Sequence, residues 1–117
     1  KFEGQQQDVA FLQHGLFSSS NSWIKKGLID SPGFLLAQHG YDVWFGNSRG
    51  NLYSHSNNHI NPVEHMKEFH DYSFAELGLY DLPAQIDKAR EVSGQDKVTY
   101  VGHSQGTTQM FYALAKN

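Results

Sequence analysis

Apolar residues gather in three short runs along the chain, and longer mixed segments separate these runs. The runs cover residues 8–13, 41–45 and 97–101. Each run is almost continuously apolar instead of alternating, which is typical of strands covered on both faces, as in a parallel sheet. The pattern therefore predicts three strands with helical connections between them.

Capping signals predict a helix between the first two runs. Ser31 followed by Pro32 is the pattern of a helix N-cap with a proline at the first helical position. Residues 33–39 would form the body of this helix, and Gly40 would stop it at the carboxyl end.

Two further helices are predicted before the third run. Ser73 and Glu76 have the spacing of a capping box, which starts the first of them. Because Pro83 cannot continue a regular helix, we expect a break near Asp81, with Asp81 capping a second helix over residues 82–92. The buried face and the C-terminal stop of this second helix are expected at Leu82, Ile86, Ala89 and Gly94.

A last helix is expected to begin near Gln105, directly after the third run. Its apolar positions are Met110, Phe111, Leu114 and Ala115. The order strand, helix, strand, helix, strand, helix favours an α/β fold with a parallel sheet and right-handed crossovers. Residues 47–72 form a long polar connection, and loops of that length are usually functional or decorative. The stretch 54–70 within it has no assigned role.

The composition is that of one globular domain. The 117 residues are 38% hydrophobic and 18% charged, with a formal net charge of -3. Because no block of Lys and Arg occurs, nothing points to nucleic acid as a partner. The absence of cysteine excludes disulfides and cysteine-ligated metals within these residues. No apolar run approaches the roughly 18 residues of a membrane span, and no signal peptide is visible.

Seven histidines raise the question of a metal site. They are His14, His39, His55, His59, His65, His70 and His103. His55 and His59 have the spacing of ligands on one helical face, but the surrounding Asn residues and Pro62 favour a loop. No metal is therefore predicted, and the histidines are interpreted as surface and loop residues.

The most informative motif is Gly-His-Ser-Gln-Gly at residues 102–106, which fits the G-x-S-x-G nucleophile elbow. In such an elbow the serine, here Ser104, lies on a sharp turn between a strand and a helix. Side chains at Gly102 and Gly106 would collide with the neighbouring strand and helix, so glycine is needed there. The amino end of the following helix favours the negative charge that develops in acyl transfer. The alternative is a glycine-rich turn with an incidental serine.

Acyl transfer also needs two backbone N–H donors for the oxyanion. One comes from the residue after the nucleophile, here Gln105. The other is expected from the loop after the first strand, where Leu16 would donate its N–H and His14 and Gly15 would support the turn. Loss of one such donor typically costs about 3 kcal/mol of transition-state stabilisation. Taken alone, this loop is an ordinary connection, and its position relative to the elbow favours the functional interpretation.

The general base and its acid partner do not follow from the same reasoning. His103 is adjacent to Ser104, but neighbouring residues in a turn point in different directions, so His103 is interpreted as support for the elbow. In folds with a G-x-S-x-G elbow the usual order along the chain is Ser, then Asp or Glu, then His. No Asp, Glu or His follows Ser104 in residues 105–117. Asp81 is interpreted as a helix cap instead of a catalytic acid. The acid and base would lie beyond Asn117 or on another chain, or be absent.

Four blocks of sequence resemble the acid lipases, a family that includes gastric lipase, lysosomal acid lipase and related sterol-ester hydrolases. The blocks are residues 11–16, 40–51, 80–84 and 100–108. Asn-Ser-Arg-Gly-Asn and Tyr-Asp-Leu-Pro-Ala within them are not general features of α/β-hydrolases. The resemblance implies that residues 1–117 form a partial α/β-hydrolase core, from oxyanion loop through nucleophile elbow, with the cap, the lid and the C-terminal half missing.

The resemblance also implies a chemistry. It implies hydrolysis of triacylglycerols or cholesteryl esters through an acyl-enzyme on Ser104, with the N–H groups of Leu16 and Gln105 as oxyanion hole and no cofactor. A neutral lipid ester would be the substrate, a secreted or lysosome-like compartment the setting, and the full protein would contact a lipid interface transiently. Asn47 and Arg49 are expected to brace loops near the site; a substrate role is the alternative.

Two other functions stay open from the residues alone. One is a non-catalytic α/β-hydrolase-like binding module, and the other is a carboxylesterase or acyltransferase of different acyl specificity. The intact nucleophile, elbow glycines and oxyanion loop favour the lipid esterase. Without base and acid, the isolated residues 1–117 are expected to be inactive, and their exposed sheet edges would favour aggregation.

Overall fold

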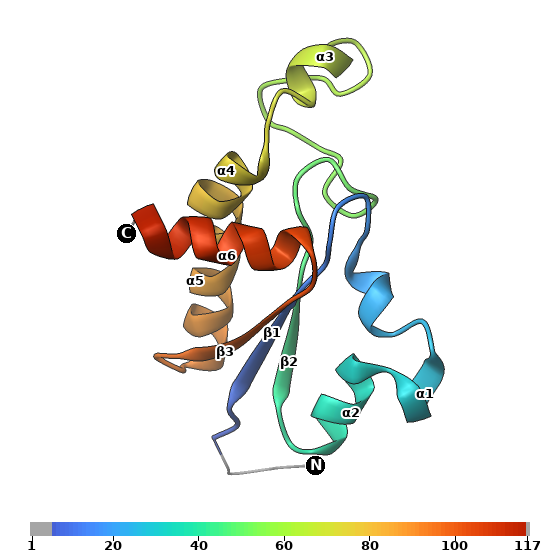
Figure 1. Cartoon of the computed structure of the whole chain (residues 1–117), viewed down its shortest axis with the longest axis vertical. Coiled ribbons are helices and arrows are strands. Elements are labelled where there is room, and N and C mark those ends of the chain that lie inside the picture. The colour runs from blue at the N-terminus through green and yellow to red at the C-terminus, as the bar shows by residue number, and fades with distance from the viewer. Residues whose placement is uncertain (1–5, 117) are drawn as a thin grey trace.

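A three-stranded parallel sheet forms the centre of the structure, a computed structural model that describes residues 6–116. The strands are β1 (Val9–Gln13), β2 (Asp42–Gly46) and β3 (Val98–Gly102), in the spatial order β2-β1-β3 (Figure 1). Each agrees with the predicted run to within one residue at either end. The last residues of all three strands are in register, so the loops that follow them emerge side by side at one edge.

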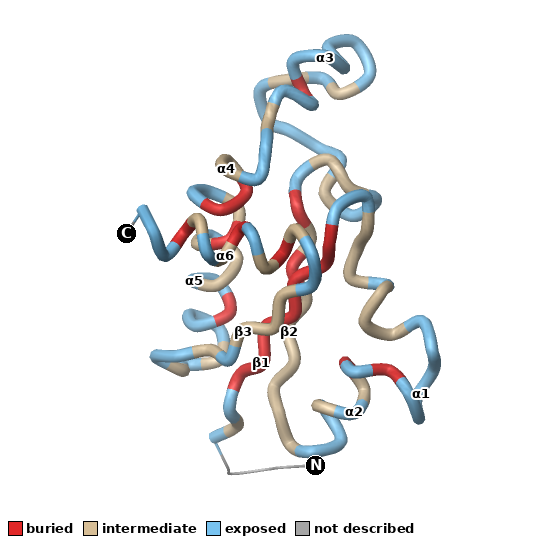
Figure 2. Tube along the Cα trace, viewed as in Figure 1, coloured by how far each residue is buried: buried red, intermediate tan, exposed pale blue. Residues whose placement is uncertain are grey.

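Burial differs between the central strand and its neighbours. Every residue of β1 is buried, whereas β2 and β3 are mostly half-buried (Figure 2). The expectation that all three strands are covered on both faces therefore holds for β1 alone, because the strand order leaves β2 and β3 at the two edges.

Helices cover the two faces of this sheet. They are the 3-10 helix η1 (Ser20–Trp23), α1 (Gly27–Asp30), α2 (Pro32–Gln38), α3 (Met66–Phe69), α4 (Phe74–Glu76), the π-helical turn η2 (Leu77–Asp81), α5 (Leu82–Ser93) and α6 (Gln105–Lys116). None of the helices within residues 6–116 combines the length and the apolar character needed to cross a membrane. The connection between β2 and α4 contains a single short helix, α3. Residues 55–71 of this connection, called here the projecting segment, extend from the body of the molecule (Figure 1).

The main core lies between the sheet and the pair α5 and α6. Phe11 of β1 packs there with Leu82 and Ala89 of α5 and with Ala113 of α6. On the opposite face, α2 packs against β2 so closely that a Cβ on Gly33 would lie 2.8 Å from the ring of Phe45. The sheet is thus sandwiched between helices on both sides, as an α/β fold requires.

The predicted caps at Ser31, Gly40, Ser73 and Gly94 lie at helix ends, but not every predicted capping hydrogen bond is formed. The Ser73 hydroxyl accepts a hydrogen bond from the backbone of α4, and the Glu76 carboxylate accepts one from the Ser73 N–H at 2.6 Å, which completes the capping box. Ser31 does precede α2, but its side chain makes no capping hydrogen bond. Gly40 and Gly94 have positive φ values of 91° and 73°, and both follow helix ends as predicted.

The predicted bounds of the second helix are confirmed, because α5 begins at Leu82 and ends at Ser93, but the predicted break at Asp81 is wrong. Residues 74–93 form one continuous helical stretch, and Asp81 has helical backbone angles and no capping hydrogen bond. The widened π turn just before Pro83 lets the helix pass the proline ring without a break. This frees the Asp81 side chain for another partner.

Candidate active site

Ser104 lies on a tight turn between the end of β3 and the start of α6. Its φ is 53°, in the left-handed region that residues other than glycine rarely adopt. Two hydrogen bonds close the turn, from the Gly106 N–H to the carbonyl of His103 and from the Thr107 N–H to the carbonyl of Ser104, both at 2.9 Å. A strained and exposed serine between a strand and a helix has the local geometry of a nucleophile elbow.

The two glycines of the motif permit this turn for the reason that the sequence predicts. A Cβ on Gly102 would lie 2.8 Å from the backbone nitrogen of Thr107, in the following helix. A Cβ on Gly106 would lie 2.7 Å from the carbonyl oxygen of Gln13, in the neighbouring strand β1. Both contacts are with backbone, which cannot move aside as a flexible side chain can, so glycine is required at both positions.

The loop after β1, residues 14–19 and called here the β1 loop, lies directly against the elbow. The His103 N–H donates to the carbonyl of Gln13 at 3.1 Å. A Cβ on Gly15 would lie 3.1 Å from the Cβ of Ser104, a tighter contact than most side chains make, so glycine at this position favours the close approach of the loop. The structure thus brings together the two stretches that were predicted from separate motifs.

The amides of Leu16 and Gln105 are free in the described part of the chain. Neither donates a hydrogen bond to another group within residues 6–116. Leu16 follows the glycine that contacts the elbow and is 56% exposed, and Gln105 is the first residue of α6. Unpaired N–H groups next to an exposed serine are available to bind an oxygen atom.

His14, at the start of the β1 loop, is buried with 3% of its surface exposed, so the interpretation of the histidines as surface residues is wrong for His14. Its Nδ1 lies 2.7 Å from the carbonyl oxygen of Gly15, and its Nε2 accepts a hydrogen bond from the Ser48 N–H at 3.1 Å. A backbone amide can only donate, so Nε2 carries no proton and Nδ1 does. Burial lowers the pKa of His14 below its ordinary value of 6.5, opposed by the hydrogen bond to Gly15. The ring is therefore held neutral.

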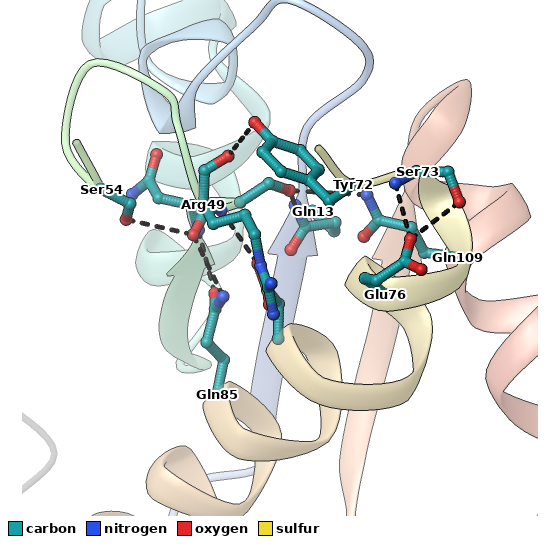
Figure 3. Close-up of polar contacts among 11 residues, drawn as sticks. Gln13, Arg49, Ser54, Tyr72, Ser73, Glu76, Gln85 and Gln109 are labelled. Carbon is teal, nitrogen blue, oxygen red and sulfur yellow. Dashed lines mark hydrogen bonds and ion pairs between the residues drawn. The ribbon is translucent and has the colours of Figure 1, made fainter. Parts of the chain in front are cut away.

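The loop after β2, residues 47–51 and called here the β2 loop, is fixed to the helices beneath it (Figure 3). The Asp81 carboxylate accepts hydrogen bonds from the Arg49 N–H at 2.9 Å and from the Arg49 Nε at 2.8 Å. Gln85 of α5 both accepts from the Asn47 N–H at 3.0 Å and donates to the Asn47 carbonyl at 3.1 Å. Asn47 and Arg49 therefore brace loops, as expected, and Asp81 is an ion-pair partner instead of a helix cap.

A buried polar centre lies under both loops, and sequence reasoning missed it. The Gln13 side chain donates to the Ser48 hydroxyl at 3.1 Å, and Gln109 of α6 approaches the same hydroxyl at 3.5 Å (Figure 3). Gln13 and Gln109 are each only 1% exposed. The available signal was a polar residue at the end of an otherwise apolar run, because a buried amide needs a partner.

A cavity of about 900 Å³ opens beside the elbow. Its lining combines the β1 loop, the β2 loop, Gln105 and a short stretch around Tyr72. Phe17 at its rim is 99% exposed and has a positive φ of 56°, a strained conformation that the sequence did not indicate. Leu52, also lining the cavity, is 75% exposed.

The remaining histidines form no metal centre or catalytic pair in the described residues. Within residues 6–116, no group of three or more His, Asp or Glu could hold a metal ion. In the projecting segment, the ring of His55 instead packs edge-on against Phe69, with centroids 5.1 Å apart. No His, Asp or Glu of the same residues forms a hydrogen bond with the Ser104 side chain.

Comparison with known proteins agrees with this geometry. The sequence pattern of the alpha/beta hydrolase fold family matches residues 11–117. The chain is 49% identical over 109 residues to lipase lipl-1 of Caenorhabditis elegans, covering 93% of the chain and 26% of that protein. It is 50% identical over 109 residues to gastric triacylglycerol lipase of Mus musculus, covering 93% and 27%. It is 50% identical over 110 residues to lipase member J of Homo sapiens, covering 94% and 30%.

The chain thus spans less than a third of the length of these curated relatives. The residues matched by the family pattern include β2, β3, most of β1, the β1 loop and the turn at Ser104. Because the family pattern extends over nearly all of the sequence, the chain belongs to the α/β-hydrolase fold family.

Proposed function

We propose that this chain supplies the nucleophile, Ser104, and the oxyanion hole, the N–H groups of Leu16 and Gln105, of a serine hydrolase that cleaves lipid esters. The observation that carries the proposal is the strained, exposed Ser104, with φ of 53°, packed against a loop whose next amide is free. Strain of this kind persists in a fold only where the surroundings hold it in place, and it is concentrated at functional sites.

In the proposed reaction, this chain supplies the nucleophile and the oxyanion hole, and the general base comes from elsewhere. The Ser104 hydroxyl attacks the ester carbonyl, and a base outside residues 6–116 takes its proton. The carbonyl oxygen becomes negative and accepts hydrogen bonds from Leu16 and Gln105, helped by the amino end of α6. The alcohol leaves with a proton from the base, and water then releases the fatty acid from the acyl-enzyme.

The substrate class follows from two observations of different kind. The chain is 50% and 48% identical in sequence to two gastric triacylglycerol lipases, whose name states their substrate. In addition, the cavity rim exposes Leu16, Phe17 and Leu52, an apolar surface suited to an acyl chain or a lipid interface. We therefore propose a neutral lipid ester as substrate, with no cofactor, and a secreted or lysosome-like setting for the full-length protein.

Covalent labelling of the full-length protein tests the nucleophile. A fluorophosphonate should attach to the peptide that contains Ser104, as seen by mass spectrometry after proteolysis. Hydrolysis of emulsified triacylglycerol should fall at least about 1000-fold in Ser104→Ala. Ser56→Ala, in the exposed part of the long loop, is the matched control and should keep the parental rate. Labelling at another serine, or an active Ser104→Ala, would reject the proposal.

A further inference from the structure

The β1 loop has little structure of its own, although it carries the Leu16 amide. Between β1 and η1 it contains no regular element, and it includes the exposed, strained Phe17. Its one internal backbone hydrogen bond runs from the Ser18 N–H to the Gly15 carbonyl at 3.3 Å. A free amide on such a loop needs support from elsewhere to keep one position.

Support at the first end of the loop comes through His14. Its Nε2 accepts from the Ser48 N–H at 3.1 Å and lies 3.0 Å from the Asn51 Nδ2. Both donors belong to the β2 loop. Because His14 directly precedes Gly15, these contacts fix the backbone just before the Leu16 amide.

Support at the second end comes through Asn47. Its side-chain oxygen accepts from the Ser20 N–H at 3.0 Å, and its Nδ2 donates to the Ser20 hydroxyl at 3.2 Å. The Asn51 Nδ2 also lies 3.5 Å from the Ser18 carbonyl. The β2 loop therefore holds the β1 loop on both sides of Leu16.

The orientation of the Asn51 amide is determined by its own oxygen. That oxygen accepts from the N–H groups of Tyr53 and Ser54, both at 3.0 Å, so the NH₂ group must point the other way. There it reaches His14 and, at 3.0 Å, the side-chain oxygen of Asn47. Asn51 thus links the two points of support into one connected network.

The network ends on rigid helices. Asp81 of η2 pairs with Arg49, and Gln85 of α5 pairs with Asn47. Tyr72, just before α4, donates its hydroxyl to the Arg49 carbonyl at 2.7 Å (Figure 3). Asp81 and Gln85 lie at the junction of η2 and α5, against the main core. The hydrogen-bond network therefore connects the β1 loop to η2 and α5, which limits how far the loop can move.

We propose that Asn51 and Asn47 are positioning residues of the oxyanion hole, which hold the Leu16 amide in place by clamping the β1 loop from the β2 loop. This rests on the proposed function. Neither side chain touches the reacting atoms, and each acts through His14, Ser18 or Ser20. The clamp predicts a loss of turnover without loss of substrate binding, because the oxyanion forms only in the transition state.

Asn51→Asp in the full-length protein separates this role from a merely structural one. The new carboxylate keeps the acceptor for Tyr53 and Ser54, so the local turn survives, but it cannot donate to His14, Ser18 or Asn47. We expect kcat per active site, counted by fluorophosphonate titration, to fall at least tenfold while KM stays within twofold. Asn47→Ala should give the same split and serves as the second variant if Asn51→Asp does not fold.

The control is Asn57→Ala, which removes an amide of the same kind. Its oxygen accepts from the His59 and Ile60 N–H groups and so stabilises only its own turn. It should leave kcat and KM within twofold of the parent. An unchanged kcat per active site in both Asn51→Asp and Asn47→Ala would overturn the clamp. An active Ser104→Ala, assayed in parallel, would instead overturn the proposed function.

Discussion

Two regions of this molecule are rich in asparagine, the β2 loop and the projecting segment, but the hydrogen bonds of their asparagine side chains span very different distances along the sequence. In the β2 loop, Asn47 and Asn51 reach Ser20 and His14, which are 27 and 37 residues away in the sequence. In the projecting segment, the side chains of Asn57 and Asn61 accept hydrogen bonds from residues two and three positions ahead. Asparagine side chains thus join distant loops in the β2 loop, where Asn51 also closes its own turn, whereas Asn57 and Asn61 close local turns alone.

The difference follows from where each region leaves the sheet. The β2 loop starts at the end of a strand that is in register with β1, so it lies against the β1 loop from the outset. The projecting segment lies away from the sheet and is mostly exposed. A small cluster within it consists of Phe69, which is buried against the rings of His55 and His70. Long-range contact, more than composition, distinguishes the candidate site.

The largest effect on the free energy of unfolding is expected from Gly106→Ala, which disrupts the contact between the elbow and the β1 loop. The new Cβ would meet the carbonyl oxygens of Gln13 at 2.7 Å and His14 at 2.9 Å. We expect the free energy of unfolding to fall by about 3 kcal/mol or more, measured by chemical denaturation, because both neighbours are backbone.

A matched glycine separates this clash from a general intolerance of alanine. Gly27 has a φ of 79°, and a Cβ there would meet nothing within 4 Å. Gly27→Ala should therefore cost only the left-handed backbone strain, about 1 kcal/mol. Equal losses in the two variants would show that the close approach of the loops does not matter for stability.

A smaller effect is expected from pH, acting through His14. Burial lowers the pKa of His14 in the folded protein below 6.5, so the unfolded chain binds more protons between the two values. This contribution to stability is complete above about pH 6.5 and decreases as the pH falls toward the lowered value. Protonation would also place an N–H on Nε2, facing the donors Ser48 and Asn51.

Denaturation at a series of pH values measures this contribution. His14→Gln should flatten the dependence of unfolding free energy on pH below 6.5, relative to the parent. His59→Gln, in the projecting segment, is the matched control and should leave that dependence in place. A parental slope in His14→Gln would assign the pH response to another group.

Much of the framework could be predicted from the sequence because its signals are local. The three strands, the capping box at Ser73 and the glycines around Ser104 each depend on residues within a few positions of one another. The β1 loop and the elbow could be assigned to one site because parallel strands bring their carboxyl ends to the same edge.

What could not be predicted depends on tertiary position. Asp81 has the residue type of a helix cap and of an ion-pair partner, and only the path of the β2 loop brings Arg49 to it. The burial of Gln13 with Gln109 joins residues from a strand and a helix that no local pattern links. The left-handed φ of Phe17 likewise has no local sequence signal, because bulky residues rarely adopt it.

The smallest effect is expected from Asn61→Ala, in the projecting segment. The lost contacts are hydrogen bonds from the Val63 and Glu64 N–H groups, at 2.9 and 3.2 Å, in an exposed turn where water can replace the amide. We expect a change of about 0.5 kcal/mol or less in unfolding free energy and no change in kcat, compared with a loss of turnover in Asn47→Ala. If Asn61→Ala impaired turnover as much as Asn47→Ala, turn-closing and loop-joining asparagines would be equivalent, and the contrast between the two regions would have no functional meaning.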